Sequence, residues 1–377
     1  MRKVTFPHMG YSHIAFKQLI EDMGFEAITP CHPNRYTLDL GVRYSPEHAC
    51  IPFKILMGNY IEALERGAEI IITSGGVGPC RAGLYGMTHE KILKSLGHDF
   101  RIVVFDPPLV NLWDFYWKLR FMVREARLSW RAFIDVIKRA WDKLKLLDEM
   151  EIKAINLRPY EVEKGSTTRA FHQCLQIIDR ARTRKEMEEA RRECHRILEK
   201  VPKDRGRRPL KVGLVGEIYC LLEPFINLEV ERTLGELGAL ACRGVFLTGY
   251  TQTDVLGKGN HNVRLLAAPY LNQFVGGHGQ NSVGETIFYA KKGFDGVIHV
   301  APFGCLPEIV AKGVLPKISR DLDIPILTLT LDEQTGRAGV QTRLEAFVDL
   351  LYQRRRAKEV KGFGTLLPGY RCGLCQH

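Results

Sequence analysis

Hydrophobic residues in the first 108 positions come in short runs, separated by stretches in which apolar residues recur at helical spacing. The short runs predict buried strands, and the spaced stretches predict helices. Strand and helix patterns that alternate in this way indicate a parallel sheet with helices on both faces. The predicted strands lie at 3–6, 25–29, 69–73 and 101–105. The predicted helices lie at 13–23, 53–66 and 89–96, and the pattern of the helix at 53–66 is amphipathic.

The pattern changes at residue 109, after which apolar positions recur only at helical spacing. All four tryptophans lie in the first half of this segment. The stripe formed by Trp113, Trp117 and Phe121 predicts a helix face buried in the core rather than a platform for a cofactor. A second long helix, rich in charge pairs, is predicted over 169–199. The segment 109–208 is therefore expected to be a helical domain, closed by a polar linker with a proline near each end.

Alternation of strands and helices returns in the last part of the chain. The sequence thus predicts an α/β fold of two doubly wound, Rossmann-like (flavodoxin-like) parallel-sheet domains, at 1–108 and 209–377, with the helical domain between them. In such sheets, ligands bind outside the carboxyl ends of the strands. The predicted strands of the second domain lie at 210–215, 239–247, 296–301 and 324–330, and its helices at 227–237, 285–292, 308–321 and 342–353.

The composition, with 45% hydrophobic and 26% charged residues over 377 positions, is that of a soluble globular protein. No run of about 20 apolar residues is present, so no membrane span is expected. The first residues enter a strand-like run directly, without an apolar signal core, which predicts a cytoplasmic location. Ten cysteines in a cytosolic chain indicate metal or redox chemistry more than disulfides.

The net charge of +11 is concentrated in the helical segment, which contains 25 Lys and Arg against 16 Asp and Glu. The tail after residue 353 is also basic. A solvated helical face explains this charge, as does an acidic partner or a phosphate-bearing substrate. A nucleic-acid partner is disfavoured, because no recognition motif accompanies the basic residues.

Three cysteines stand where a predicted strand gives way to a helix: Cys50, Cys80 and Cys305. Cys50 and Cys305 share the form Cys-x-Pro, and proline favours the first turn of a helix, so each thiol is expected at a helix N-terminus. There the helix dipole and free N–H groups favour a thiolate, which binds soft metals and iron–sulfur clusters. The three positions predict one metal site in the cleft between the two sheet domains.

The other cysteines have plainer interpretations. As single residues they are expected to be small core side chains or idle thiols: Cys31, Cys174, Cys194, Cys220 and Cys242. Cys372 and Cys375 form a C-x-x-C at the C-terminus, which could bind metal, act as a redox pair or belong to a frayed tail.

A glycine-rich segment at 276–284 precedes a predicted helix. The backbone N–H groups around Gly277 and Gly279 could cradle a phosphate or a substrate, although a turn without a ligand explains them equally. The segment does not fit Gly-x-Gly-x-x-Gly, because position 282 is serine. His278 is a candidate acid/base group or iron ligand in the cleft.

Charged residues beside the cysteines are further candidates. Arg81 and Lys54 could hydrogen-bond a cluster sulfide or an anionic substrate and would raise a cluster's potential. Glu308 lies three residues after Cys305 and is a candidate catalytic group, although the helix dipole alone would explain a carboxylate there. Two more acidic residues, Glu217 and Glu223, lie near predicted strand ends.

A dinucleotide-dependent dehydrogenase is disfavoured, because residues 7–12, which follow the first predicted strand, lack a glycine fingerprint. The chain also lacks the Gly-x-x-x-x-Gly-Lys-Ser/Thr phosphate loop of an ATPase.

Several motifs stand out in both outer domains, whereas the helical segment carries none. They lie at 44–54, 75–81, 216–219, 222–225, 276–279, 301–308 and 342–347. Together they resemble the dehydratase component of the 2-hydroxyacyl-CoA dehydratase and benzoyl-CoA reductase group, and more closely the short activase-related proteins often called CoA protein activase.

The resemblance implies a [4Fe-4S] cluster held by Cys50, Cys80 and Cys305, with one iron open or bound by a non-cysteine ligand. It implies anaerobic chemistry, in which an ATP-hydrolysing iron–sulfur activator delivers a low-potential electron that the cluster passes to an acyl-CoA thioester, generating a ketyl radical. Some relatives hold a double-cubane [8Fe-9S] cluster, for which Cys31 and Cys220 could supply the further thiolates.

The resemblance also implies an assembly of two related subunits, as a homodimer or heterodimer. No feature of the sequence specifies a CoA thioester pocket, so the substrate stays open. Two functions follow: an electron-accepting reductase or dehydratase component, or a non-catalytic scaffold or activator-binding subunit that pairs with a larger homologue.

Overall fold

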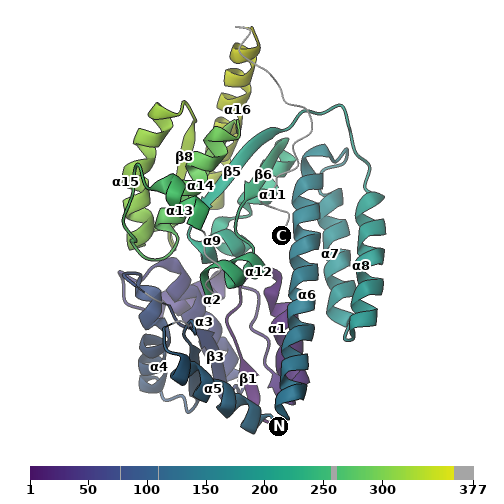
Figure 1. The fold of residues 1–377 in the computed structure, drawn as a ribbon, viewed down its shortest axis with the longest axis vertical. Coiled ribbons are helices and arrows are strands. Elements are labelled where there is room, and N and C mark those ends of the chain that lie inside the picture. Colours follow the sequence, from purple (N-terminus) through teal and green to yellow (C-terminus); the bar gives the residue numbers. More distant parts are fainter. Residues whose placement is uncertain (77, 109, 256–260, 361–377) are drawn as a thin grey trace.

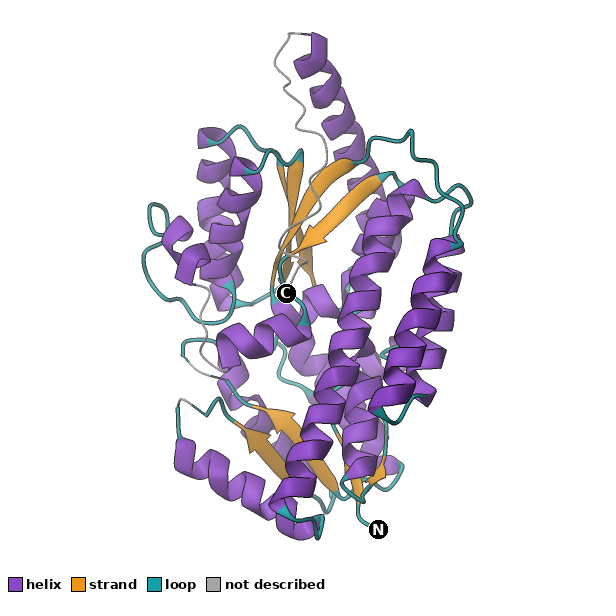
Figure 2. Cartoon of the chain, turned by 45° about the vertical axis from the view of Figure 1, so that its right-hand side comes forward, coloured by secondary structure: helices purple, strands orange, loops and turns teal. Residues whose placement is uncertain are grey.

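A computed structural model describes residues 1–76, 78–108, 110–255 and 261–360. The chain is an α/β protein with two four-stranded, all-parallel sheets, as the sequence predicts. In Figure 1 the sheet of strands β5 to β8 lies above the sheet of β1 to β4, and the long helices α6, α7 and α8 run along one side. Figure 2 shows the two sheets as separate groups of strands, with helices around and between them.

The first sheet has the strand order β2-β1-β3-β4. The chain runs from β1 to β2 on one side of β1 and then crosses to β3 on its other side. The direction in which strands are added therefore reverses between β1 and β3, and doubly wound sheets bind ligands at such a point. The elements of this unit are β1 (Lys3–Thr5), the 3-10 helix η1 (Gly10–Ser12), α1 (His13–Asp22), β2 (Glu26–Ala27), α2 (Arg35–Tyr44), α3 (Ile51–Glu65), β3 (Ile70–Ser74), the 3-10 helix η2 (Arg81–Leu84), α4 (Tyr85–Ser95) and β4 (Arg101–Phe105).

The second sheet repeats this topology with the order β6-β5-β7-β8. Strand β7 therefore occupies the position that β3 has in the first sheet. The elements are β5 (Leu210–Gly216), α9 (Ile218–Leu222), α10 (Pro224–Asn227), α11 (Val230–Glu236), β6 (Ala239–Arg243), α12 (Leu247–Tyr250), the π-helix η4 (Thr251–Val255), α13 (His261–Ala267), α14 (Gly279–Lys291), β7 (Gly296–Pro302), α15 (Leu306–Asp321), β8 (Ile326–Leu331) and α16 (Arg337–Val360).

Helix α3 positions the loop before it through a close contact with α2. A Cβ at Gly41 would lie 1.8 Å from the Lys54 carbonyl oxygen, and one at Gly58 would lie 1.9 Å from the Thr37 carbonyl oxygen. Only glycine allows two helices to approach this closely. Nearly every residue of α3 is buried, so the amphipathic helix expected at 53–66 is instead a central core helix.

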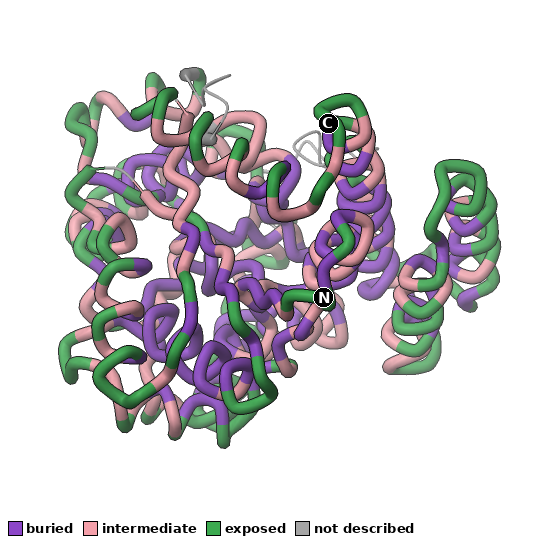
Figure 3. The backbone as a smooth tube through the Cα atoms, turned by 90° about the horizontal axis from the view of Figure 1, so that it is seen from below, coloured by how far each residue is buried: buried purple, intermediate pink, exposed green. Residues whose placement is uncertain are grey.

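The segment between the sheets is helical, with α5 (Leu112–Glu125), α6 (Trp130–Leu157), the 3-10 helix η3 (Arg158–Tyr160), α7 (Ser166–Arg180) and α8 (Arg184–Glu199). It shares its core with its neighbours. Met122 and Val123 of α5 pack into the same cluster as Val4 and Val103 of the first sheet. Helix α6 contacts α1 on the first unit and β6, α11 and α12 on the second, so it spans both. Figure 3 shows buried backbone through the middle of the molecule and exposed backbone on its outer helices.

The tryptophan stripe of α5 is not in the core, and that prediction was wrong. Trp113 is 75% exposed and Trp117 56% exposed, whereas Phe121 is half-buried beneath the Arg101 guanidinium. The opposite face of the helix, with Met122, packs against the first sheet. Helical spacing places apolar residues on one face but does not say which face a neighbouring element covers.

None of the described helices is both long and apolar enough to cross a lipid bilayer.

A buried hydrogen-bonded contact between α6 and the second unit predicts that stability depends on pH. The Asp148 carboxylate accepts hydrogen bonds from the Thr248 backbone N–H (3.0 Å) and hydroxyl (2.6 Å) at the start of α12. Burial raises the pKa of Asp148 from 3.8 to about 6. The folded state thus favours the neutral Asp148 side chain. The stability that this preference adds at low pH is lost as the pH rises from about 4 to about 6.

Asp148→Asn keeps an oxygen acceptor for Thr248 but cannot ionise. It is expected to remove this loss and to raise the free energy of unfolding at pH 8 by on the order of 2 kcal/mol. Urea unfolding at pH 4, 6 and 8 measures it. Asp142→Asn, at a partly exposed position of the same helix, is the control and should change stability little. An equal pH slope in the wild type and in Asp148→Asn would contradict the expectation.

Candidate functional site

The three predicted cysteines each occupy the N-cap position of a helix. Cys50 caps α3, Cys80 caps η2 and Cys305 caps α15, all with extended backbone. Pro52 and Pro307 stand in the first turns of α3 and α15, where the missing N–H of proline costs no helical hydrogen bond. The local prediction for the cysteines is confirmed at all three positions.

Arg81 links the three cysteine loops. Its Nη2 donates to the His48 carbonyl oxygen (3.1 Å), two residues before Cys50, and to the Gly304 carbonyl oxygen (2.8 Å), next to Cys305. Arg81 itself follows Cys80 in the chain. One guanidinium therefore joins loops from the carboxyl ends of β3 and β7, the equivalent strands of the two sheets, and brings the three N-caps to one place.

The glycine-rich segment lies against two of these loops. A Cβ at Gly276, where φ is +81°, would lie 2.8 Å from the Cys80 nitrogen. A Cβ at Gly277 would lie 3.2 Å from Pro307 Cγ and 3.8 Å from Cys80 Sγ, and one at Gly279 would lie 2.3 Å from the Pro307 carbonyl oxygen. Glycine is thus required by close packing between the Cys80 and Cys305 loops, which explains the segment without a bound phosphate.

Burial raises the pKa of the Cys50, Cys80 and Cys305 thiols. The backbone amides of Phe53, Ala82 and Glu308, at the helix N-termini, act in the opposite direction but are outweighed. The helix N-termini alone therefore do not hold thiolates here, contrary to expectation. Thiolates at these positions would need a further positive charge, of the kind a coordinated metal ion provides.

Two acidic side chains lie beside the thiols. The Glu217 carboxylate, which accepts a hydrogen bond from the Cys220 backbone N–H (2.8 Å), raises the pKa of all three cysteines through its charge. Burial raises the pKa of Glu217 itself. Glu308 is fully buried, and its Oε2 accepts hydrogen bonds from the Ser282 hydroxyl (2.9 Å) and His299 Nε2 (2.8 Å).

The other oxygen of Glu308, Oε1, is buried and lacks a hydrogen-bond partner among the described residues. Since the Glu308 charge also raises the pKa of Cys305 and Cys80, this carboxylate belongs to the site. The Tyr85 hydroxyl, at the start of α4, hydrogen-bonds the Cys50 thiol. The site thus combines three thiols, two carboxylates and one phenol in a largely buried setting.

Two predicted site residues have other contacts. Lys54 is buried and forms an ion pair with Glu333 (2.7 Å), which follows β8, so its charge is already balanced. His278 is buried at the N-cap of α14, with its ring 5.4 Å from that of Tyr250.

The remaining cysteines separate into four groups. Cys220 is fully buried, and the neighbouring Cys50 and Cys305 raise its pKa, so it lies near the site. Cys31 instead accepts a hydrogen bond from Arg66 (3.5 Å). Cys174, Cys194 and Cys242 lie in the hydrophobic core as expected, and Cys372 and Cys375 fall outside the described residues.

The spacing of the thiols bears on the kind of metal that fits. A single zinc ion holds thiolate sulfurs at about 2.3 Å, which brings them within about 4.6 Å of one another. Across the described residues, the three cysteines do not form a group whose ligand atoms all lie within 4.8 Å. The three sulfurs are therefore not already arranged as the ligands of one such ion.

No family model matches the chain, and no curated protein matches it.

Sequence reasoning did not single out Tyr85, and it noted Glu217 only as an acidic residue near a strand end. Tyr85 becomes part of the site only because α4 packs beside α3, for which no local motif exists. Glu217 had a usable signal, since it directly follows β5, the strand that pairs with β7 before Cys305.

The Arg81 tie gives a prediction for the metal-free protein. Arg81→Ala removes two hydrogen bonds between loops, each worth about 0.5–1.5 kcal/mol. Transient opening of the site should become about tenfold more frequent, since about 1.4 kcal/mol is a factor of ten. Alkylation of Cys50 and Cys305 by iodoacetamide, followed by peptide mass spectrometry, measures this.

The control is Arg169→Ala, which removes an exposed arginine whose one ion pair within the described residues is with Glu163. It should leave the alkylation rates unchanged. Equal rates in the wild type and in Arg81→Ala would show that the arginine does not hold the loops together.

Proposed function

We propose that this chain is an iron–sulfur protein of the 2-hydroxyacyl-CoA dehydratase type, with Cys50, Cys80 and Cys305 as the ligands of a [4Fe-4S] cluster. The observation that supports it most is the meeting of three N-cap cysteines from two α/β units, joined by Arg81. The family resemblance of the surrounding motifs agrees with this ligand set.

When bound, such a cluster supplies one-electron transfer at low potential, from an ATP-dependent iron–sulfur activator to an acyl-CoA or another small substrate. The protein contributes the surroundings. Burial and the carboxylates of Glu217 and Glu308 disfavour added negative charge and so favour a low potential. Arg81 acts in the opposite sense.

Glu308 and His299 are the residues that we assign to proton transfer. Glu308 Oε1 is a buried acceptor, and the His299 imidazole, also fully buried, orients the carboxylate through Oε2. A carboxylate held in this way can accept or return a proton at Oε1 without access to bulk water. His278 lies on α14, the helix that supplies Ser282, and is a second acid/base candidate.

A second function is a non-catalytic scaffold or activator-binding subunit that pairs with a larger homologue. The exposed aromatic side chains of α5 favour it, because contiguous exposed apolar surface marks interaction sites. The exposed members are Leu112, Trp113, Tyr116, Trp117 and, on α6, Trp130.

The deciding experiment is to purify the chain without oxygen and to measure iron, acid-labile sulfide and the EPR spectrum after reduction. About four irons per chain with a cluster signal would support the proposal. About eight irons would indicate the double-cubane form and involve Cys220. An iron-free protein, even after anaerobic reconstitution, would overturn the assignment and favour the scaffold.

A further inference from the structure

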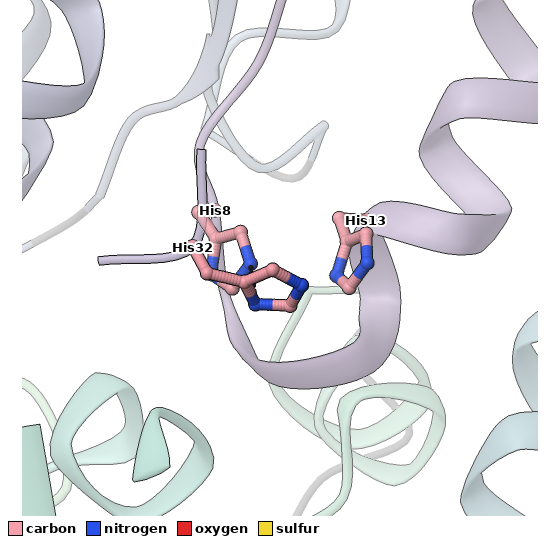
Figure 4. Close-up of side chains that lie close together, drawn as sticks. All are labelled: His8, His13 and His32. Atoms are coloured by element: carbon pink, nitrogen blue, oxygen red, sulfur yellow. Dashed lines mark hydrogen bonds between the residues drawn. The ribbon is translucent and has the colours of Figure 1, made fainter. Parts of the chain in front are cut away.

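Three histidines outside the cysteine site come together at the carboxyl edge of the first sheet (Figure 4). His8 follows β1, His13 begins α1 and His32 follows β2. One ring nitrogen from each lies within 4.8 Å of the others. The ring centres are 4.7–4.8 Å apart, and no other group of three His, Cys, Asp or Glu in the described part of the chain is this compact.

Two of these rings are oriented by acceptors on their far side. His8 Nδ1 lies 2.8 Å from Glu223 Oε2, and His13 Nδ1 lies 2.9 Å from the Gly10 carbonyl oxygen. Both Nδ1 atoms are therefore already hydrogen-bonded, and Nε2 of His8 and Nε2 of His13 are the ring nitrogens that can act as metal ligands. Metal-binding histidines characteristically donate their other N–H to a carboxylate or a backbone carbonyl, as here.

The carboxylate that orients His8 is itself held firmly. Glu223 is 3% exposed and also accepts a hydrogen bond from the Gly10 backbone N–H (2.9 Å). It comes from the second unit, between α9 and α10, whereas the three histidines come from the first. The Tyr219 hydroxyl donates to the His8 carbonyl oxygen (2.5 Å) and holds the backbone of that residue.

The rings are suited to coordination in their protonation state as well. Burial and the nearby His8 lower the pKa of His13 to about 4 and also lower the pKa of His32. Both imidazoles are then neutral at pH 7 and offer a lone pair. His8 is buried, His13 is half-buried and His32 is exposed, so the cluster opens to solvent on the His32 side.

We propose that His8, His13 and His32 bind one divalent transition-metal ion of the zinc class, through Nε2 of His8 and His13 and one ring nitrogen of His32. Neutral imidazoles suit Zn²⁺, and three protein ligands leave one coordination position for water. In the metal-free protein, His8 Nε2 instead lies 3.1 Å from His32 Nδ1. The site does not depend on the cluster proposed for the cysteines.

The test uses the full chain, stripped of metal and titrated anaerobically with Zn²⁺ by calorimetry and with Co²⁺ by absorption. A histidine site gives cobalt d–d bands without a thiolate-to-cobalt charge-transfer band. We expect His32→Ala, which alters an exposed side chain, and His13→Ala to abolish this binding. Glu223→Gln should weaken it by about 10- to 100-fold, since it removes the charge that orients His8.

The matched control is His98→Ala, which removes a half-buried histidine of the first unit outside the cluster. It should bind metal as the wild type does, and circular dichroism should show each variant folded. Binding that survives in folded His32→Ala, cobalt d–d bands that come only with a thiolate charge-transfer band and are unchanged in His13→Ala, or no binding by the wild type would each overturn the proposal.

Discussion

Cys305→Ala is expected to lose essentially all of its cluster iron after anaerobic purification, and the EPR signal of the reduced protein with it. Cys305 is 7% exposed, at the junction of β7 and α15, so water or buffer thiols cannot easily take its place. Of the three proposed ligands, it is the one that comes from the second unit. Without it, the remaining thiols would have to hold the cluster from one side only.

Cys174→Ala is the matched control. Cys174 is fully buried between α7 and α8, where it contacts Cys194, so its replacement also removes a buried thiol. Its iron and sulfide contents should equal those of the wild type. Iron retained in Cys305→Ala would mean that Cys305 is not a ligand. Iron lost to the same degree in Cys174→Ala would mean that the cluster depends on the general packing of the chain and not on the proposed ligand.

Cys50→Ala and Cys80→Ala extend the comparison within the site. Cys80 is only half-buried, beside the exposed Gly277, so an exogenous thiol has access to its position. Partial recovery of iron on adding a small thiol is therefore expected for Cys80→Ala and not for Cys305→Ala. This order of rescue follows from burial, and the iron content after reconstitution with and without the thiol measures it.

The parts of this site that could be predicted are those that depend on a few neighbouring residues in the sequence. A buried strand, a turn and a Cys-x-Pro at the start of a helix identify the N-caps of α3 and α15, because proline and helix periodicity act over a few residues. Parallel strands then bring Cys80 and Cys305 to the carboxyl edges of their sheets. The repeated strand order makes these two positions equivalent.

The parts that could not be predicted depend on which surfaces meet. Arg81 looked like a ligand for a sulfide or an anion, but its partners, the carbonyls of His48 and Gly304, become neighbours only when the two sheets meet. Lys54 likewise pairs with Glu333, far away in the sequence. The histidine cluster joins two loops and the start of a helix, and no spacing rule connects His8, His13 and His32.

Because the three cysteines come from both sheet-bearing units, the site depends on the contacts that hold the two units together. Helix α6 packs against both of them, and its contact with the second unit includes a buried arginine. Arg243, at the end of β6, is 2% exposed and forms ion pairs with Glu151 of α6 (2.9 Å) and Glu231 of α11 (2.8 Å). It also donates to the carbonyl oxygen of Leu221 (3.3 Å), near the end of α9, the short helix that directly follows Glu217.

Arg243→Met is accordingly expected to lower the free energy of unfolding by about 3–5 kcal/mol, because two largely buried carboxylates lose the buried cation with which both form ion pairs. Burial already raises the pKa of Glu231, against the effect of Arg243. A carboxyl group with a raised pKa in the folded state stabilises the fold at low pH and loses that contribution as the pH rises. The deficit of the variant should therefore be smaller at pH 5 than at pH 8.

Urea unfolding of the two proteins at both pH values measures this, with Arg232→Met as the control. Arg232 also pairs with two glutamates, Glu229 and Glu236, but at 43% exposure, where such pairs are worth about 1 kcal/mol or less. Adding Glu231→Gln to Arg243→Met should recover part of the loss, since one buried charge is then removed. A deficit equal to that of Arg232→Met would mean that water reaches the carboxylates, and α6 would then be a weaker link between the two cysteine-bearing units than its burial indicates.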